Sequence, residues 1–320
     1  MQQKTRNLQF ALKRTPKSSY GAMVKKDFFK HWQLYLIFLP VLIYYILFCY
    51  GPMYGILAAF QRYNVRAGIA GSTWIGLQNF RDFFGSYYFL RILKNTLVLN
   101  ISDLIFAWPC SIIFALLLNE VRNVQFKRSV QTLTYLPYFI STVVAAGIII
   151  DFTNTNGLIN DALAFFGMER QSLLANKGLF PVIYVFSNIW QATGYGSIIY
   201  VAAIGGVNTE LYEAAMLDGA GRLRQAWHVT LPGISPTIIT LFIMRVGNIL
   251  TVSFEKILLL QNAANQESSE VIATFVYKKG LIESVYGYST AVGVFTSIIS
   301  LIFLFAANTL SRKFSETSLW

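Results

Sequence analysis

The chain has 320 residues, of which 55% are hydrophobic, 16% aromatic and only 13% charged. Soluble domains carry roughly 25% charged residues, so this composition excludes an ordinary soluble enzyme or binding domain and places the chain in a membrane. The formal net charge is +11. Because the basic residues gather beside apolar runs, they indicate attraction to anionic lipid headgroups and not to nucleic acid.

The N-terminal segment, residues 1–32, is expected to be a basic cytoplasmic tail rich in Lys, Ser and Gln, with an amphipathic stretch from Ala22 to Trp32. It is not read as a cleavable signal, because the apolar run that follows has no short core ending in a small-residue cleavage site. We expect this tail to lie outside the membrane domain.

Six apolar runs follow, each longer than the roughly 20 residues that a helix needs to cross a bilayer. Asp103 lies within the second run and Arg245 within the fifth. Backbone amides in lipid must be paired within their own segment, so the sequence predicts an all-α, polytopic bundle of six transmembrane helices over residues 33–312, with 313–320 as a C-terminal tail. The predicted spans are about 33–61, 93–118, 129–150, 178–209, 235–260 and 284–311.

Basic residues next to membrane spans predict the orientation, because cytoplasmic loops carry an excess of Lys and Arg. An even number of spans places both termini on one side, and most of the 26 basic residues fall there. We therefore expect both termini, and the loop between the fourth and fifth spans, to be cytoplasmic. The basic residues on that side are Lys4, Arg6, Lys13, Arg14, Lys17, Lys25, Lys26, Lys30, Arg122, Lys127, Arg128, Arg222, Arg224, Arg312 and Lys313.

The loops on the opposite side offer two further predictions. After the first span, the pattern W-x-G-L-x-N-F runs from Trp74 to Phe80. Its aromatic ends are expected to anchor at the membrane interface while Gly76 permits a turn, a structural role that we prefer to direct ligand contact. The outer loops 153–180 and 261–283 are candidates for docking an external protein, or are solvated connections without a partner.

Polar side chains inside apolar spans mark candidate positions along a path for a polar cargo, because such a cargo needs hydrogen-bond partners in the membrane. In the fourth span, Asn188, Gln191 and Tyr195 are spaced three and four residues apart and share one helical face. Amides and an aromatic ring suit a sugar. The alternative is hydrogen bonding between packed helices. The other predicted path residues are Tyr138, Ser141, Arg245 and Asn248.

Arg245 leaves three environments open. An isolated cation at mid-membrane costs at least a few kcal/mol, so it should face water or an anion. It can form a structural ion pair with Asp103, stay a free cation that binds an acidic sugar such as a uronate, or lie near the lipid interface or in some other pairing. Arg245 alone therefore does not establish an anionic cargo.

The segment between the fourth and fifth spans reads EAAMLDGAGRLRQAWHVTLP from Glu213 to Pro232. Asn208 or Thr209 can cap a short helix here, and acidic residues favour its N-terminal end. Gly219 permits a turn that a side chain would resist. Leu231 and Pro232 are expected to end the element, because proline does not continue a helix.

This segment resembles the EAA loop of type I ABC importer permeases, and most closely that of the carbohydrate-uptake branch. The matching residues are Glu213, Ala214, Ala215, Gly219, Val229, Leu231 and Pro232, with Asp218 extending the pattern. The W-x-G-L-x-N-F segment is also similar to one in sugar-importer permeases. The resemblance implies that residues 208–232 form a coupling helix seated in a cytoplasmic ATPase.

The resemblance also implies the partners and the setting. The chain would work in a bacterial cytoplasmic membrane with a second, homologous permease subunit, two cytoplasmic ABC ATPases and an extracytoplasmic binding protein that delivers an oligosaccharide or polysaccharide fragment. ATP and Mg would bind the partner ATPases, and this chain would need no cofactor of its own.

Three other functions remain as alternatives. The same architecture can import glycerol phosphate, a peptide or an amino acid, and a secondary transporter or channel would need no ATPase. A membrane-embedded enzyme is the third, but the sequence has no Ser-His-Asp set, paired catalytic carboxylates or phosphate-binding glycine-rich loop. Cys49, Cys110, His31 and His228 lack metal-ligand spacing, so no metal site and no catalytic residue is predicted.

Overall fold

The computed structural model describes residues 28–314 and residue 318, in two compact units that divide between Leu57 and Ala58. Most of the predicted basic tail and of the C-terminal tail lies outside these residues. In the first unit, α2 (Trp32–Tyr44) continues into a π-helical turn, Tyr45–Tyr50, and then into a 3-10 helix, Gly51–Phe60, that ends in the second unit. This helical stretch matches the first predicted span.

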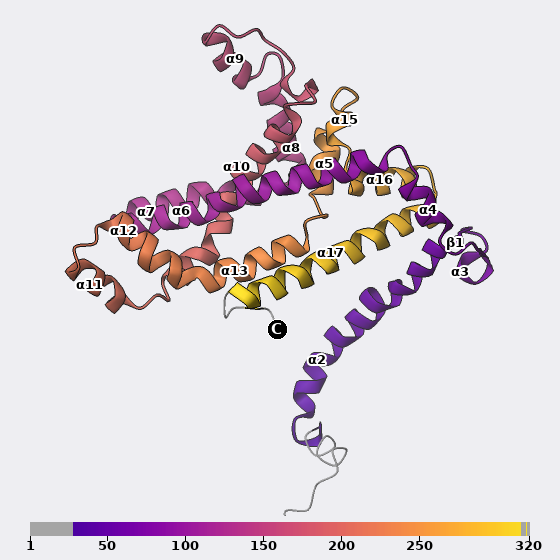
Figure 1. The fold of residues 1–320 in the computed structure, drawn as a ribbon, viewed down its shortest axis with the longest axis horizontal. Coiled ribbons are helices and arrows are strands. Elements are labelled where there is room, and N and C mark those ends of the chain that lie inside the picture. Colours follow the sequence, from indigo (N-terminus) through magenta and orange to yellow (C-terminus); the bar gives the residue numbers. More distant parts are fainter. Residues whose placement is uncertain (1–27, 315–317, 319–320) are drawn as a thin grey trace, which may run out of the picture. The chain divides into compact units, whose positions relative to one another are not determined.

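Long helical rods form the body of the second unit (Figure 1). One rod consists of α5 (Phe89–Ser102), a π turn at Asp103–Ala107, and α6 (Trp108–Glu120). The single helix α10 (Phe180–Ile204) packs along α6, while α13 (Leu231–Gly247) lies beside α17 (Tyr286–Phe314). These rods coincide with the second, fourth and sixth predicted spans and with the first half of the fifth.

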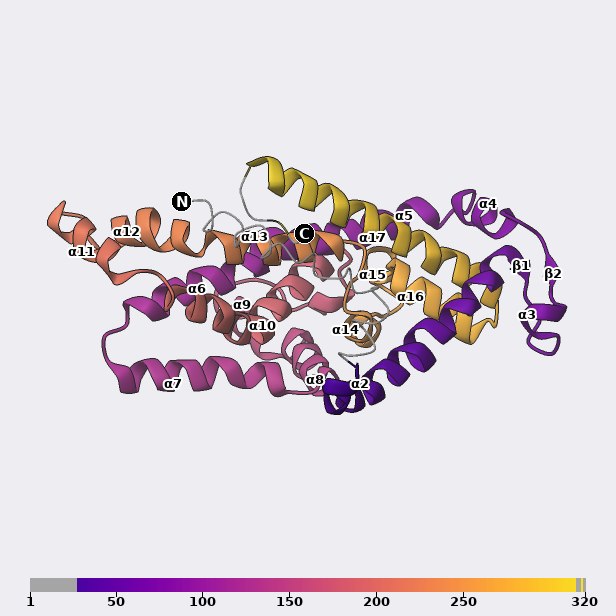
Figure 2. The same cartoon turned by 90° about the horizontal axis from the view of Figure 1, so that it is seen from below.

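Shorter elements connect the rods at both ends of this unit. Figures 1 and 2 show α11 and α12 at one end, with α4 and the two strands at the other. The strands pair antiparallel, with Gln61 opposite Trp74. The shorter elements are β1 (Gln61–Arg62), α3 (Gly68–Gly71), β2 (Thr73–Trp74), α4 (Gln78–Phe84), α7 (Val124–Tyr135), α8 (Thr142–Thr153), α9 (Leu158–Phe165), α11 (Thr209–Leu217), α12 (Arg222–Gln225), α14 (Phe254–Leu260), α15 (Gln266–Ser269) and α16 (Ile272–Tyr277), with 3-10 turns at Leu136–Phe139 and Leu173–Ala175 and π turns at Ala226–Thr230 and Lys278–Ile282.

Two predicted spans are not single helices. The third, 129–150, is divided into α7 and α8 by a 3-10 turn that contains Pro137, and Ser141 caps the new helix by accepting a hydrogen bond from the Val144 amide (3.3 Å). The fifth, 235–260, ends as a helix at Gly247, and the chain turns before α14 begins. Hydropathy alone did not reveal these breaks, because the residues of the breaks themselves, 136–140 and 249–252, are mostly apolar.

Among the residues that the structure describes, five helical stretches are long and apolar enough to cross a membrane. Helix α10 has 25 residues but is not one of them, because Ser187, Asn188 and Gln191 lower the mean hydropathy of its middle. The fourth predicted span, 178–209, is therefore long enough but unusually polar. The five stretches are Trp32–Phe60, Phe89–Glu120, Thr142–Phe165, Arg222–Gly247 and Tyr286–Lys313.

Three prolines follow π turns. Pro52, Pro109 and Pro232 each lie two residues after such a turn ends, and the helix continues past them. A proline ring clashes with the carbonyl four residues earlier, and a widened turn moves that carbonyl away. The prediction that Leu231 and Pro232 end the coupling element is therefore wrong, because helical structure runs from Arg222 to Gly247 through the turn at Ala226–Thr230.

The W-x-G-L-x-N-F segment has a structural role. The Trp74 ring stacks on Phe60 with centroids 5.6 Å apart, and Gly76 takes a positive φ of 61°. The buried Asn79 amide donates to the carbonyls of Ala59 (2.8 Å) and Gln61 (3.1 Å). These contacts hold α4 against the β1 strand.

The second unit has three buried apolar clusters. The first gathers around Phe180 and Tyr184 of α10, with residues of α8, α14 and the start of α16. The second lies around Phe83, between α4, α5, α16 and α17. The third joins α6, α10 and α13 around Tyr200. The polar middle of α10 lies between the first and third clusters.

Candidate functional site

The coupling segment begins with a capped helix. The Asn208 side chain accepts a hydrogen bond from the Glu210 amide (3.0 Å), so Asn208 and not Thr209 is the cap of α11. Gly219 takes a φ of 78°, a left-handed conformation that side chains rarely adopt, and turns the chain toward α12. The Tyr212 hydroxyl lies 2.9 Å from the Thr230 hydroxyl and ties α11 to the base of α13.

The tip of this segment is apolar and exposed. Leu217 and Leu223 are 90% and 89% exposed, and Met216 and Trp227 are more than half exposed. Fully exposed large apolar side chains grouped on one projection mark a protein interaction site. Glu213, Ala214, Ala215 and Asp218 lie on the same helix or directly after it, whereas Leu231 and Pro232 begin α13.

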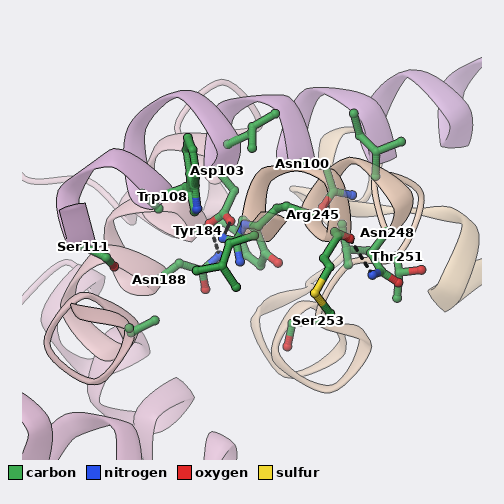
Figure 3. A pocket seen from close by; sticks show the side chains of 18 of the residues that line it. Asn100, Asp103, Trp108, Ser111, Tyr184, Asn188, Arg245, Asn248, Thr251 and Ser253 are labelled. Atoms are coloured by element: carbon green, nitrogen blue, oxygen red, sulfur yellow. Dashed lines mark hydrogen bonds and ion pairs between the residues drawn. The ribbon is translucent and has the colours of Figure 1, made fainter. Parts of the chain in front are cut away.

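A cavity of 560 Å³ opens in the middle of the second unit (Figure 3). Small-molecule sites range over roughly 300–1,000 Å³. Its walls come from the π turn at Asp103–Ala107 and the helices α5 and α6 on either side of it, from α10, and from the end of α13 and the turn that follows it. The polar residues in these walls are Asn100, Asp103, Ser111, Tyr184, Asn188, Tyr200, Arg245, Asn248, Thr251 and Ser253.

Arg245 and Asp103 form an ion pair at the wall of this cavity, through the guanidinium Nη2 and the carboxylate Oδ2. The Asp103 side chain is 15% exposed and that of Arg245 is 46% exposed. Of the three environments open for Arg245, the structure has the pair, but with the guanidinium still facing the cavity. Structural pairing and contact with a cargo are therefore compatible.

The amide of Asn188 extends this ion pair. Asn188 Nδ2 donates to the second carboxylate oxygen of Asp103, Oδ1 (2.9 Å), and Asn188 Oδ1 accepts a hydrogen bond from Lys256 Nζ (2.7 Å). Lys256, on α14, is only 4% exposed. Two cations thus share one carboxylate, and the group carries a net charge of +1. We call these four residues, Lys256, Asn188, Asp103 and Arg245, the charge relay.

Lys256 was missed in the sequence, although it lies within the predicted fifth span, 235–260, for which Arg245 alone was considered as a charged residue. The signal that could have found it is its spacing: Lys256 and Leu260 are four residues apart on α14 and both are buried. Residues four apart share a helical face. A lysine on an otherwise apolar face indicates a buried partner.

The seven predicted path residues fall into two groups. Asn188, Arg245 and Asn248 line the cavity; Asn248 donates to the carbonyl of Met244 in its own helix (2.9 Å). The other four, Tyr138, Ser141, Gln191 and Tyr195, gather where α10 meets the break between α7 and α8.

In the second group, the Tyr138 ring stacks on Tyr195 with centroids 3.9 Å apart and planes 6° apart, and Gln191 Nε2 donates to the carbonyl of Ile140 (3.3 Å). Gly194 makes this close approach possible, because a Cβ there would lie 2.1 Å from the backbone oxygen of Thr134. The two tyrosine rings remain 46% and 39% exposed. This group joins helices and also presents an aromatic surface.

The loops 153–180 and 261–283 are anchored to each other. Asn265, fully buried, donates to the Leu174 carbonyl (2.9 Å), and Lys177 pairs with Glu267 (2.9 Å), which lowers the pKa of that carboxyl. Glu270 is buried between Arg91 (2.7 Å) and Lys278 (3.2 Å). The loop 261–283 therefore packs on α5, whereas α9 ends in exposed Phe165 and Phe166 (85% and 77%).

Residues 89–316 match the family model of the binding-protein-dependent transport system inner membrane component. The chain belongs to this family. The match covers the helices from α5 onward, including the coupling segment and the charge relay, so the fold is that of a type I ABC importer permease and the chain is a permease.

Two relatives of this permease support the family assignment. It is 46% identical over 288 residues to the polygalacturonan/rhamnogalacturonan transport system permease protein YteP of Bacillus subtilis strain 168, with 90% of each chain covered. It is 42% identical over 303 residues to the protein LplB of the same organism, with 94% of each chain covered.

The permease is also similar to a chain in the crystal structure of a bacterial alginate ABC transporter in complex with an alginate pentasaccharide-bound periplasmic protein. The TM-score is 0.85 at 39% sequence identity, and the match covers 92% of this chain and 99% of that one. The prediction of an all-α importer permease of the carbohydrate-uptake branch is therefore confirmed.

Proposed function

We propose that this permease is one transmembrane subunit of an ATP-driven importer of acidic oligosaccharides, that is, fragments that carry uronate carboxylates. The observation that carries the proposal is the net charge of +1 in the charge relay, with Arg245 half-exposed at the cavity. An arginine fork suits a carboxylate, because two parallel N–H donors match its two oxygens. Relatives named for polygalacturonan and alginate transport support the same cargo class.

The permease forms part of the path for the cargo, and its partner ATPases hydrolyse ATP. Helix α11, with Glu213 to Gly219, docks on a cytoplasmic ATPase that holds ATP and Mg, and the exposed Leu217 and Leu223 provide the apolar contact. A second, homologous permease completes the translocation path, and the exposed pair Tyr138 and Tyr195 offers it an aromatic wall. Both termini lie on the ATPase side.

An extracytoplasmic binding protein delivers the cargo to the outer loops, where α9 presents exposed phenylalanines. ATP binding favours the closed ATPase dimer, and a ligand shifts an equilibrium only by its different affinity for the two states. The Gly219 turn and the Tyr212–Thr230 contact transmit that shift from α11 to α13, which bears Arg245.

The cargo is tested with the complete complex in proteoliposomes. ATP hydrolysis is measured with binding protein loaded with uronate oligosaccharides, and separately with neutral oligosaccharides, glycerol phosphate, peptides or amino acids. We expect stimulation by the uronate oligosaccharides. Stimulation only by one of the other ligands would assign a different cargo.

The docking surface is tested by Leu217→Asp. Leu217 is 90% exposed, so its replacement leaves the fold of this chain intact while removing an apolar contact. The matched control is Phe165→Asp, an 85% exposed residue on α9. We expect the ATPases to be lost from the purified complex of Leu217→Asp and retained in that of Phe165→Asp. Equal retention would refute docking at α11.

A further inference from the structure

Lys256 is a buried cation behind the cavity wall. It is 4% exposed and lies on α14, whose other buried residues, Ile257 and Leu260, belong to the apolar cluster around Phe180. A buried ammonium is costly unless it is paired. The contact that the structure shows for it is the hydrogen bond from Nζ to Asn188 Oδ1 (2.7 Å).

The Asn188 amide connects Lys256 to Asp103 through two hydrogen bonds. This amide is polarised, with the oxygen on the lysine and Nδ2 on Asp103 Oδ1 (2.9 Å). The other carboxylate oxygen, Oδ2, accepts from Arg245. Each oxygen of Asp103 therefore serves a different cation, one through an amide and one directly.

The two cations differ in access to the cavity. Asp103, Asn188 and Arg245 line the cavity, and Lys256 is not among the described residues that do so. The Arg245 side chain is 46% exposed. Of the two positive charges that share Asp103, only the arginine can reach a molecule in the cavity.

We propose that Lys256 is a specificity-determining positioning residue: it holds the compensating charge for Asp103, so that Arg245 can leave Asp103 and bind a carboxylate of the cargo. Without Lys256, Asp103 and Arg245 form a closed neutral pair, and moving Arg245 leaves a carboxylate unpaired at mid-membrane. With Lys256, Asp103 stays compensated. This inference rests on the proposed acidic cargo.

The test compares transport of a uronate oligosaccharide with transport of its methyl ester, which has the same length and no charge. Both are delivered by the same binding protein to the complete complex in proteoliposomes. The acid-to-ester rate ratio of each variant is divided by that of the wild type, so discrimination by the binding protein cancels.

Lys256→Gln keeps a donor for Asn188 and removes the charge, and Lys256→Arg keeps the charge. We expect the acid-to-ester ratio to fall roughly tenfold in Lys256→Gln, as for the loss of one charge-assisted hydrogen bond. It should stay within about twofold of wild type in Lys256→Arg. Lys94→Met, at an exposed position on α5, is a control for loss of a lysine charge and should leave the ratio unchanged.

The possible results of this test distinguish the proposed acidic cargo from the proposed role of Lys256. A wild type that carries acid and ester equally refutes the acidic cargo itself. A wild type that prefers the acid, with the preference intact in Lys256→Gln, refutes the role of Lys256 and leaves the proposed function standing. Failure of Lys256→Gln to assemble, with its hydrogen bond to Asn188 kept, would mean that the residue is purely structural and would also overturn the inference.

Discussion

Removing the carboxylate of Asp103 should destabilise the permease much more than removing the charge of Arg245. Asp103→Asn leaves Lys256, which is 4% exposed, without a compensating charge. Arg245→Gln leaves Asp103 compensated by Lys256 through Asn188, and Arg245 itself is 46% exposed.

The magnitudes follow from this difference in exposure. Breaking a buried ion pair costs about 3–5 kcal/mol, and since Asp103 is 15% exposed we expect about 3 kcal/mol for Asp103→Asn. A pair with a half-exposed partner is screened by solvent, so we expect about 1 kcal/mol for Arg245→Gln. The double variant should cost about as much as Asp103→Asn alone, because Lys256 remains the uncompensated group.

The assay is unfolding of the purified chain in mixed micelles, with the free energy of unfolding measured for each variant. Asn248→Ala is the control: Asn248 lines the same cavity but its amide is bonded to its own helix, so it should change the free energy by about 0.5 kcal/mol or less. An Arg245→Gln variant as unstable as Asp103→Asn would refute the charge relay as we describe it.

Three further predictions concern glycine contacts and the Asn79 anchor. Gly194→Ala should lower the free energy of unfolding by about 3 kcal/mol, because its Cβ would meet the Thr134 backbone, whereas Gly147→Ala on α8 has open space and should change little in the same unfolding measurement. Gly219→Val forces a side chain into a left-handed conformation and should reduce the ATPase activity of the complex. Gly221→Val, two residues further along the chain, has a negative φ and open space and should not reduce it. Equal activities of the two variants would contradict the role of the turn. Asn79→Ala removes two hydrogen bonds of a buried amide and should cost about 2 kcal/mol in unfolding, against little for the exposed Gln78→Ala; similar values would show that the amide does not anchor α4.

The sequence predicted the coupling segment well because its structure depends on local chemistry. A capping side chain at Asn208 and a positive φ at Gly219 follow from residue type within one turn of helix. The same local reasoning failed at Pro232, because the π turn before it removes the clash that normally ends a helix.

The cavity could be predicted only in part. The pattern in α10 identified Asn188 as a polar residue facing the path, but it also grouped Gln191 and Tyr195 with it, which lie against the break between α7 and α8. Which side of a helix meets a cavity depends on the packing of its neighbours. Lys256 was hidden because the turn after Gly247 folds α14 back into the core, a tertiary event that hydropathy does not report.

The π turn at Asp103–Ala107 also fixes the rotational phase of the rod that contains it. A π turn holds one residue more than an α-helical turn of the same rotation, so it takes up that residue without rotating the helix that follows. If the same residues formed ordinary α-helix, Trp108 to Glu120 would be rotated by about 100° relative to α5, the advance of one residue. Ser111 would then leave the cavity wall, and Ala115 would leave its cluster with Tyr200. The wide geometry of this single turn is therefore as strict a requirement as any side chain in it.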